Sequence, residues 1–148
     1  MKSLQLANEG DAAKLLPLVA AFHQEMGFAT TEEQQTAAVA PLLAGSPHGA
    51  IWLIGPRKAP VGYIAVTFGW SLEFGGMDAF VDELFIRPAV RKRGMGGEAL
   101  AGIAKALGEG GVRALHLEVD REDETTQRFY RRAHFQKRDK YVLMSKEL

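Results

Sequence analysis

Apolar residues recur every three to four positions near the start of the chain, a spacing that places them on one face of a helix. After a short strand expected at residues 3–6, Asp11 can cap this helix, whose apolar positions are Leu15, Leu16, Val19, Phe22 and Met26. Pro17 lies inside it, and because an interior proline costs about 3 kcal/mol, we expect a kink or a later helix start there. A second helix is predicted over residues 31–44, before a Gly-Ser-Pro turn.

The pattern then changes from helical to extended. Residues 49–54 and 61–71 are rich in β-branched and aromatic side chains, and the loop over residues 55–60 joins them as a hairpin. A turn at Gly75 and Gly76 leads into a third strand over residues 78–86. We therefore expect three adjacent antiparallel strands.

A glycine cluster starts the next helix, whose apolar face is formed by Leu100, Ile103, Ala104 and Leu107. A strand over residues 112–119 follows, and because a helix separates it from the strand over residues 78–86, we expect the two strands to be parallel. A last helix over residues 123–132 precedes a final hairpin formed by residues 135–137 and 141–145. This succession predicts the α/β (α+β) class.

Composition narrows the kind of protein. The chain has 148 residues, which suits a single domain over residues 1–148, and its 18 basic and 18 acidic residues balance to a net charge of zero. No overall field therefore draws it to nucleic acid or to an anionic membrane. The absence of cysteine excludes disulfides and thiolate chemistry. No apolar run approaches the roughly 20 residues of a membrane span, and the start lacks a signal-peptide pattern, so we expect a cytoplasmic protein.

The run over residues 91–97 stands where a strand passes into a helix. The first amides of a helix have no intrahelical acceptor, glycine lets a ligand approach the backbone, and Arg91, Lys92 and Arg93 add positive charge. These features predict an anion site, although the glycines alone are equally compatible with a tight turn beside a solvated basic run. The turn has neither the Gly-Lys-Ser/Thr of a phosphate loop nor the Gly-x-Gly-x-x-Gly of a dinucleotide site.

This turn resembles the signature of the GNAT superfamily of N-acetyltransferases, Arg/Gln-x-x-Gly-x-Gly/Ala, which Arg91, Gly94 and Gly96 meet. Residues 83–88 are similar to the family's lead-in to that motif, and residues 129–135 are similar to its Leu-Tyr-x-x-x-Gly-Phe block. The resemblance implies the GNAT fold, a central mixed, mostly antiparallel twisted sheet of about seven strands flanked by about four helices.

The resemblance also implies binding of acetyl-CoA, with no metal. The turn would hold the pyrophosphate through its backbone amides and basic side chains, contributed by Arg91, Lys92, Arg93, Gly94, Met95, Gly96 and Gly97. The strand before it would separate from its parallel neighbour, leaving backbone groups free to pair with the pantetheine arm at Leu84, Phe85 and Ile86. Two positions depart from the family pattern, since His134 replaces a glycine and Asp123 stands where asparagine is common.

An alkylamine has a pKa near 10.4, so it must lose a proton before it can attack a thioester. The resemblance suggests Tyr130 as the acid that protonates the leaving thiolate, although a tyrosine packed beside Phe129 is the structural alternative. For the base, this stretch is similar to that of spermidine/spermine acetyltransferases, and the resemblance places the base on Asp82, with Glu83 as the close second. Adjacent strand residues face opposite sides, so we expect at most one of the two to point into a given cleft.

The acceptor is expected to be a small cationic amine, polyamine-like or amino-acid-like, acetylated by direct transfer. His23, Glu25 and Glu73 are the candidates for binding it. Alternatives are acetylation of a protein N-terminus or lysine, and a non-catalytic acyl-CoA-binding module. The resemblance also allows a homodimer. The histidines show no metal-ligand spacing.

Overall fold

The computed structural model describes residues 3–148, and the chain divides into two compact units, one up to Glu118 and the other Val119–Leu148. The first unit contains a five-stranded sheet in the order β1-β2-β3-β4-β5. Its elements are β1 (Leu4–Leu6), a 3-10 turn η1 (Glu9–Asp11), α1 (Ala12–Met26), α2 (Glu32–Leu43), β2 (Gly49–Ile54), β3 (Gly62–Ser71), β4 (Gly76–Ile86), a 3-10 turn η2 (Pro88–Val90), α3 (Met95–Glu109) and β5 (Ala114–His116). The second unit contains α4 (Glu124–Arg132).

The strand pairing confirms a mixed, mostly antiparallel sheet. Strands β1 to β4 pair antiparallel in chain order, whereas β5 pairs parallel to β4 after the helical crossover through α3. A two-residue turn can reverse a chain, but a parallel neighbour needs a longer connection, which α3 supplies. The elements expected over residues 31–44, 49–54, 61–71 and 78–86 agree with α2, β2, β3 and β4 to within two residues.

The predicted final hairpin is wrong, and the sheet has five strands in the described chain instead of about seven. Residues 135–145, all of which the structure describes, form no strand, and the parallel strand expected over residues 112–119 is reduced to β5. An apolar run becomes a strand only where a second strand satisfies its backbone groups. In the unit Val119–Leu148, the side chains of Tyr141, Val142, Leu143 and Met144 are exposed.

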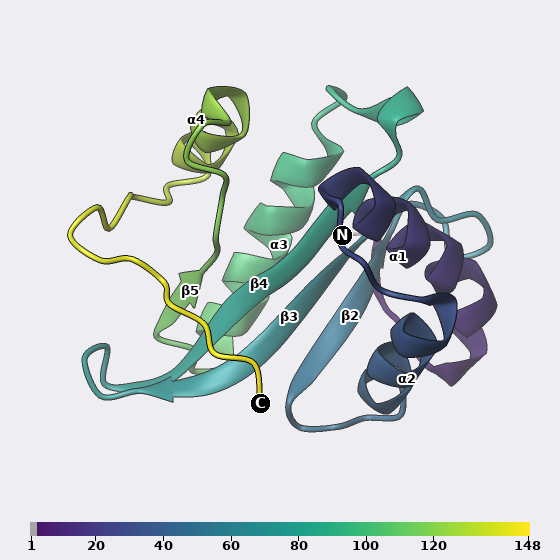
Figure 1. Ribbon diagram of the computed structural model, residues 1–148, viewed down its shortest axis with the longest axis horizontal. Helices are drawn as coiled ribbons and strands as arrows, with labels where there is room; N and C mark the ends of the chain where they lie inside the picture. Colours follow the sequence, from purple (N-terminus) through teal and green to yellow (C-terminus); the bar gives the residue numbers. More distant parts are fainter. Residues whose placement is uncertain (1–2) are drawn as a thin grey trace. The chain divides into compact units, whose positions relative to one another are not determined.

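Both faces of the sheet are covered, which explains why β3 is apolar at consecutive positions. Helices α1 and α2 lie on one face, and α3 lies on the other (Figure 1). Tyr63 and Ala65 of β3 belong to the core cluster beneath α1 and α2, together with Ala7, Leu15, Leu18, Val19, Val39, Leu43, Ile51, Leu53 and Phe85. The alternate residues Ile64 and Val66 are fully buried but do not belong to that cluster. Their side chains point to the other face of the sheet, because successive strand residues face opposite sides.

Helix α1 runs without interruption through Pro17, so the expected later start is not observed. The loss at an interior proline is about 3 kcal/mol, whereas full burial of an aliphatic side chain contributes about 1.5–3 kcal/mol. Leu15, Leu18 and Val19 on this helix are all buried. Their burial outweighs the cost of the proline, and the helix continues as far as His23 and Glu25.

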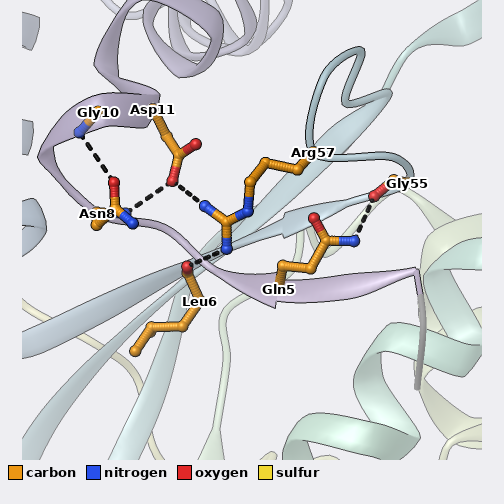
Figure 2. A network of polar contacts seen from close by, with 7 residues as sticks. All are labelled: Gln5, Leu6, Asn8, Gly10, Asp11, Gly55 and Arg57. Atoms are coloured by element: carbon orange, nitrogen blue, oxygen red, sulfur yellow. Dashed lines mark hydrogen bonds and ion pairs between the residues drawn. The ribbon is translucent and has the colours of Figure 1, made fainter.

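A polar network fixes the start of α1 against the loop between β2 and β3 (Figure 2). The Arg57 guanidinium pairs with the buried Asp11 carboxylate and also donates to the Leu6 carbonyl at 2.9 Å. Although burial opposes ionisation of Asp11, hydrogen bonds from the Asn8 amide and from Arg57 hold its pKa below the usual value. Since α1 follows directly, this network sets where the helix begins above the sheet.

Within residues 3–148, no helix is both long enough and apolar enough to cross a membrane.

Candidate active site

A β-bulge in β4 determines how its two acidic residues are presented. Ala65 of β3 pairs with Glu83, but the next residue, Val66, pairs with Val81, so Asp82 has no partner in the register. An extra residue in one strand changes which side chains face each side of the sheet. Glu83 therefore lies on the face covered by α1 and α2, directly opposite Ala65.

Both Asp82 and Glu83 line the same cavity, contrary to the expectation that only one would face a given cleft. That expectation assumed strict alternation along the strand, which the bulge breaks at Asp82. The two residues differ in exposure. Asp82 is exposed, whereas the Glu83 side chain retains 15% of its accessible surface.

Glu83 is held by two side chains from different elements. Tyr63 of β3 donates from its hydroxyl to Oε1 of Glu83 at 2.7 Å, and His23 Nε2 of α1 lies 2.6 Å from Oε2. The other nitrogen of His23, Nδ1, lies 2.6 Å from Oγ1 of Thr30. Both carboxylate oxygens and both imidazole nitrogens thus have partners.

The hydrogen bonds form one consistent chain of donors. Gln35 Nε2 donates to Thr30 Oγ1 at 3.1 Å, which leaves the Thr30 hydroxyl hydrogen for His23 Nδ1. His23 Nε2 then carries the hydrogen that it donates to ionised Glu83. If Oε2 of Glu83 carries a proton, the same contact is kept by the other imidazole tautomer, in which Nδ1 donates to Thr30 and Nε2 accepts from Glu83. The hydrogen bond between Glu83 and His23 can therefore form with the carboxyl group in either protonation state.

Burial is the largest influence on Glu83 and raises its pKa above the usual value for a glutamate. The hydrogen bonds from Tyr63 and His23 oppose this shift because they favour the carboxylate, and the negative charge of Asp82 adds to it. Burial, followed by the charge of Glu83, also raises the pKa of Tyr63, so this hydroxyl stays protonated and donating. A carboxylate with a raised pKa in a cavity is suited to general base catalysis.

The cavity beside these residues has a volume of about 100 Å³. Its polar lining consists of His23, Gln35, Asp82 and Glu83. Its apolar lining comes from α1, α2, β2 and β3 and consists of Val19, Ala38, Val39, Leu42, Ile51, Tyr63 and Ala65. The carboxylates are therefore part of a mainly apolar site between the two helices and the sheet.

The glycine turn forms the second part of the candidate site. Lys92 and Gly94 adopt positive φ angles of 66° and 83°, and α3 begins immediately afterwards. Glu98 donates the first hydrogen bond of the helix, to the Gly94 carbonyl at 3.0 Å. Among the described residues, the amides from Lys92 to Gly97 have no acceptor in the protein. This is the arrangement expected of an anion site at a helix N-terminus.

The turn is also open to a ligand. A Cβ atom built on Gly94 or Gly97 would meet no atom within 4 Å. Free space at these positions and unpaired amides fit a diphosphate group better than a closed structural turn.

Arg91 connects the turn to α1. Its guanidinium donates to both carboxylate oxygens of Glu25, at 3.0 and 2.8 Å, and its Nε donates to the Ile86 carbonyl at 2.8 Å. Glu25, which the sequence suggested for the acceptor, is thus paired with a residue suggested for acetyl-CoA. The Arg91 side chain is 39% exposed and the Glu25 side chain is 42% exposed.

The end of β4 leaves one edge of the strand without a β5 partner. Strand β5 pairs only with Asp78, Ala79 and Phe80. The part of β4 that contains Leu84, Phe85 and Ile86 pairs with β3 alone among the described strands. The separation of the two parallel strands is therefore present at the predicted place.

Glu73 does not line this cavity. It lies in the turn between β3 and β4, three residues before Gly76, the first residue of β4, which is itself seven residues before Glu83. At a rise of about 3.3 Å per residue, that is roughly 23 Å along the strand. Asp78 is likewise occupied elsewhere, paired with His116 at 3.2 Å. The acidic residues that follow one another in sequence are spread along the hairpin because an extended strand separates them.

Tyr130 belongs to the unit Val119–Leu148 and is described within that unit alone. Its ring packs against Phe129 and Phe135, with centroids 5.1 and 5.8 Å away. Burial raises the pKa of its hydroxyl, and the nearby charge of Asp123 adds to the shift. Asp123 caps α4 by accepting from Thr126, and His134 adopts a positive φ of 72°, the conformation for which the family uses glycine.

Sequence analysis missed Tyr63, Thr30 and Gln35. A tyrosine in an otherwise apolar strand is a usable signal, because a buried phenol needs a hydrogen-bond partner. Thr30 and Gln35 carried no such signal, since threonine and glutamine at the start of a helix are typical of capping. Within the described residues, no three or more acidic or histidine side chains are grouped so that they could hold a metal ion.

Comparisons with known proteins show the family and the fold of the chain. The model of the acetyltransferase (GNAT) family matches residues 17–135. An integron cassette protein, HFX_CASS3, from the mobile metagenome of Cole Harbour Salt Marsh is 36% identical, with a TM-score of 0.86 over 99% of this chain and 90% of the other. A comparison with curated proteins finds no match.

More distant structures share the fold. The aminoglycoside N-acetyltransferase AAC(6')-Iy, solved in complex with CoA, is 14% identical with a TM-score of 0.82, over 98% of this chain and 94% of the other. A ribosomal-protein-alanine N-acetyltransferase from Brucella melitensis biovar Abortus 2308 is 16% identical with a TM-score of 0.76, over 98% and 99% of the two chains.

Proposed function

Because the chain belongs to the acetyltransferase (GNAT) family, we propose that it transfers an acetyl group from acetyl-CoA directly to a small primary amine. The observation that carries this proposal is the largely buried Glu83 carboxylate, held by Tyr63 and His23 in a cavity on the strand that leads to the open amide turn. Acetylation of an amine by acetyl-CoA needs a base that deprotonates the amine and a site that holds the diphosphate, and here both candidates adjoin one strand.

The turn would hold the diphosphate of acetyl-CoA. Its donors are the backbone amides of residues 92–97, with Arg91, Lys92 and Arg93 supplying positive charge around them. The backbone of Leu84, Phe85 and Ile86 would pair with the amide-bearing arm along the edge of β4 that β5 leaves free. When bound, acetyl-CoA supplies the acetyl group as a thioester.

Glu83 is the base in this proposal. An amine arrives protonated, and the negative charges of Asp82 and Glu83 attract it to the mouth of the cavity. Glu83 then takes one proton, so that the nitrogen lone pair becomes available for attack on the acetyl carbon. His23 Nε2 stays hydrogen-bonded to the carboxyl group after Glu83 takes the proton, and Tyr63 keeps that group oriented. Tyr130 remains our candidate for returning a proton to the departing thiolate.

The acceptor would be small because the cavity is small, about 100 Å³. The classes suggested by the sequence, polyamine-like and amino-acid-like amines, are the first to test. Aminoglycoside acetyltransferases share the fold at low identity, and that likeness does not extend to the acceptor.

A panel of primary amines incubated with the protein and acetyl-CoA, with thiol release as the readout, tests this function. We expect release that depends on the amine. The Glu83→Gln variant should lose release while retaining acetyl-CoA affinity by calorimetry. Glu33→Gln, on the exposed start of α2, is the matched control and should behave as the unmodified protein. If acetyl-CoA binds but no amine promotes release, the protein is an acyl-CoA-binding module instead.

A further inference from the structure

The cavity beside Glu83 has a mainly apolar lining with two carboxylates, and this lining restricts the class of amine that can bind there. We infer that it binds the aliphatic group of a monoamine, with the amino group at the carboxylate end and the hydrocarbon among the apolar side chains. This inference rests on the proposed function and adds the class of acceptor. It selects a short aliphatic monoamine over a polycation such as a polyamine.

The apolar part of the cavity is built from several elements. Val19 of α1, Val39 and Leu42 of α2, Ile51 of β2 and Ala65 of β3 all line it. Apart from Leu42, which is half-buried, each is at most 7% exposed. A hydrocarbon that enters this space loses its contact with water, which is favourable in proportion to the area buried.

The polar groups are confined to one connected set. Gln35, Thr30, His23 and Glu83 are joined by consecutive hydrogen bonds, and Asp82 is the neighbour of Glu83 on β4. Only the two carboxylates carry a negative charge among the lining residues. One ammonium group can be paired there, and the charge is concentrated at one site.

A second ammonium group would have no comparable partner inside the cavity. The remaining polar lining residue from α2 is Gln35, a neutral amide already engaged with Thr30. Moving a charge into apolar surroundings without an opposite charge is costly. The cavity therefore discriminates against diamines whose chain would carry the second charge into it.

The decisive experiment compares amines of almost equal basicity and different length. Along methylamine, ethylamine, propylamine and butylamine, kcat/KM should rise about fourfold per methylene, or about 60-fold overall, until the cavity is full. Butylamine should also exceed 1,4-diaminobutane by at least about tenfold. A flat series, or a diamine or polyamine that outperforms butylamine, would overturn the inference while leaving the proposed function intact.

Two variants test whether the hydrocarbon occupies this cavity. Ala38→Leu fills it from α2, and Ala65→Val fills it from β3 with a residue that suits a strand. In both, the ratio of kcat/KM for butylamine to that for methylamine should fall toward one. Ala37→Leu is the matched control, because Ala37 is exposed and lies outside the lining, and its ratio should be unchanged. An unchanged ratio in both filled variants would show that the alkyl group binds elsewhere.

A complete lack of acetylation would refute the proposed function without settling the cavity. Calorimetry with butylammonium then provides the test. Binding that Ala65→Val weakens at least tenfold and Ala37→Leu leaves unchanged supports the inference. Absence of binding, or equal binding by all three proteins, overturns it.

Discussion

The cavity at Glu83 and the turn over residues 92–97 adjoin the same part of β4, but they differ in whether their polar groups have hydrogen-bond partners. In the cavity, Glu83, His23 and Tyr63 satisfy one another at 2.6 to 2.7 Å. In the turn, successive backbone amides have no acceptor among the described residues. The polar groups of the cavity are therefore satisfied within the protein, whereas the amides of the turn can bond to solvent or to a ligand.

This difference has an energetic basis. A buried carboxylate without partners would be strongly unfavourable, so the protein supplies partners from α1 and β3. Amides at an exposed turn can hydrogen-bond to water at little cost, and an anion can replace that water. Mutations at the two places should accordingly affect different measurements: proton transfer for the cavity, and acetyl-CoA affinity for the turn.

The largest effect is expected from Glu83→Gln, which keeps the shape of the side chain but removes the base. The turnover number should fall about a hundredfold to ten-thousandfold, the usual contribution of a general base. Acetyl-CoA affinity, measured by calorimetry, should remain unchanged because the turn is intact. A comparable loss in Asp82→Asn, with Glu83→Gln still active, would transfer the role of base to the bulge residue.

The substitution Gly96→Ile in the turn should instead affect acetyl-CoA affinity. A β-branched side chain would obstruct approach to the amides, and loss of hydrogen bonds to a charged group should weaken acetyl-CoA binding at least about tenfold. Gly108→Ile is the matched control, since Gly108 lies in the same helix with free space at its Cβ position. Equal affinity in the two variants would refute an anion site at the turn.

The pH dependence of kcat/KM distinguishes the partners of Glu83. Activity should fall as the pH decreases through the raised pKa of Glu83, because a protonated carboxyl cannot accept a proton. Tyr63→Phe removes a hydrogen bond that favours the carboxylate, so this loss should move to higher pH. Asp82→Asn removes a neighbouring negative charge, so the loss should move to lower pH. If the pH at which activity is lost shifted in the same direction in both variants, the hydrogen bond from Tyr63 to Glu83 would be contradicted.

The smallest effect concerns Arg91 and Glu25, the ion pair that joins the turn to α1. Both side chains are substantially exposed, so the coupling energy should be only about 0.2–1 kcal/mol. A double-mutant cycle of Arg91→Gln and Glu25→Gln, followed by urea unfolding, measures it. A value of several kcal/mol would mean that the two regions are one structural unit, and the contrast between them would no longer hold.

The sequence predicted most of the helices and strands because their causes are local. The apolar spacing at Leu15, Val19 and Phe22 and the glycines at positions 94, 96 and 97 are readable within a few residues. Prediction was wrong over residues 135–145, where the apolar run resembles a strand but pairs with none. The alternation of side chains also led to a wrong orientation at Asp82, because a bulge depends on the partner strand.

The sequence by itself determined the order of the elements as far as α4, the glycine turn after β4, and the acidic pair on β4. Local backbone preference, glycine and charge are sufficient for these. Only the tertiary structure decided that Glu83 meets Tyr63, 20 residues away, and His23, 60 residues away. Those contacts depend on strand register, on the bulge and on the packing of α1 over the sheet, which arise from pairing between distant segments.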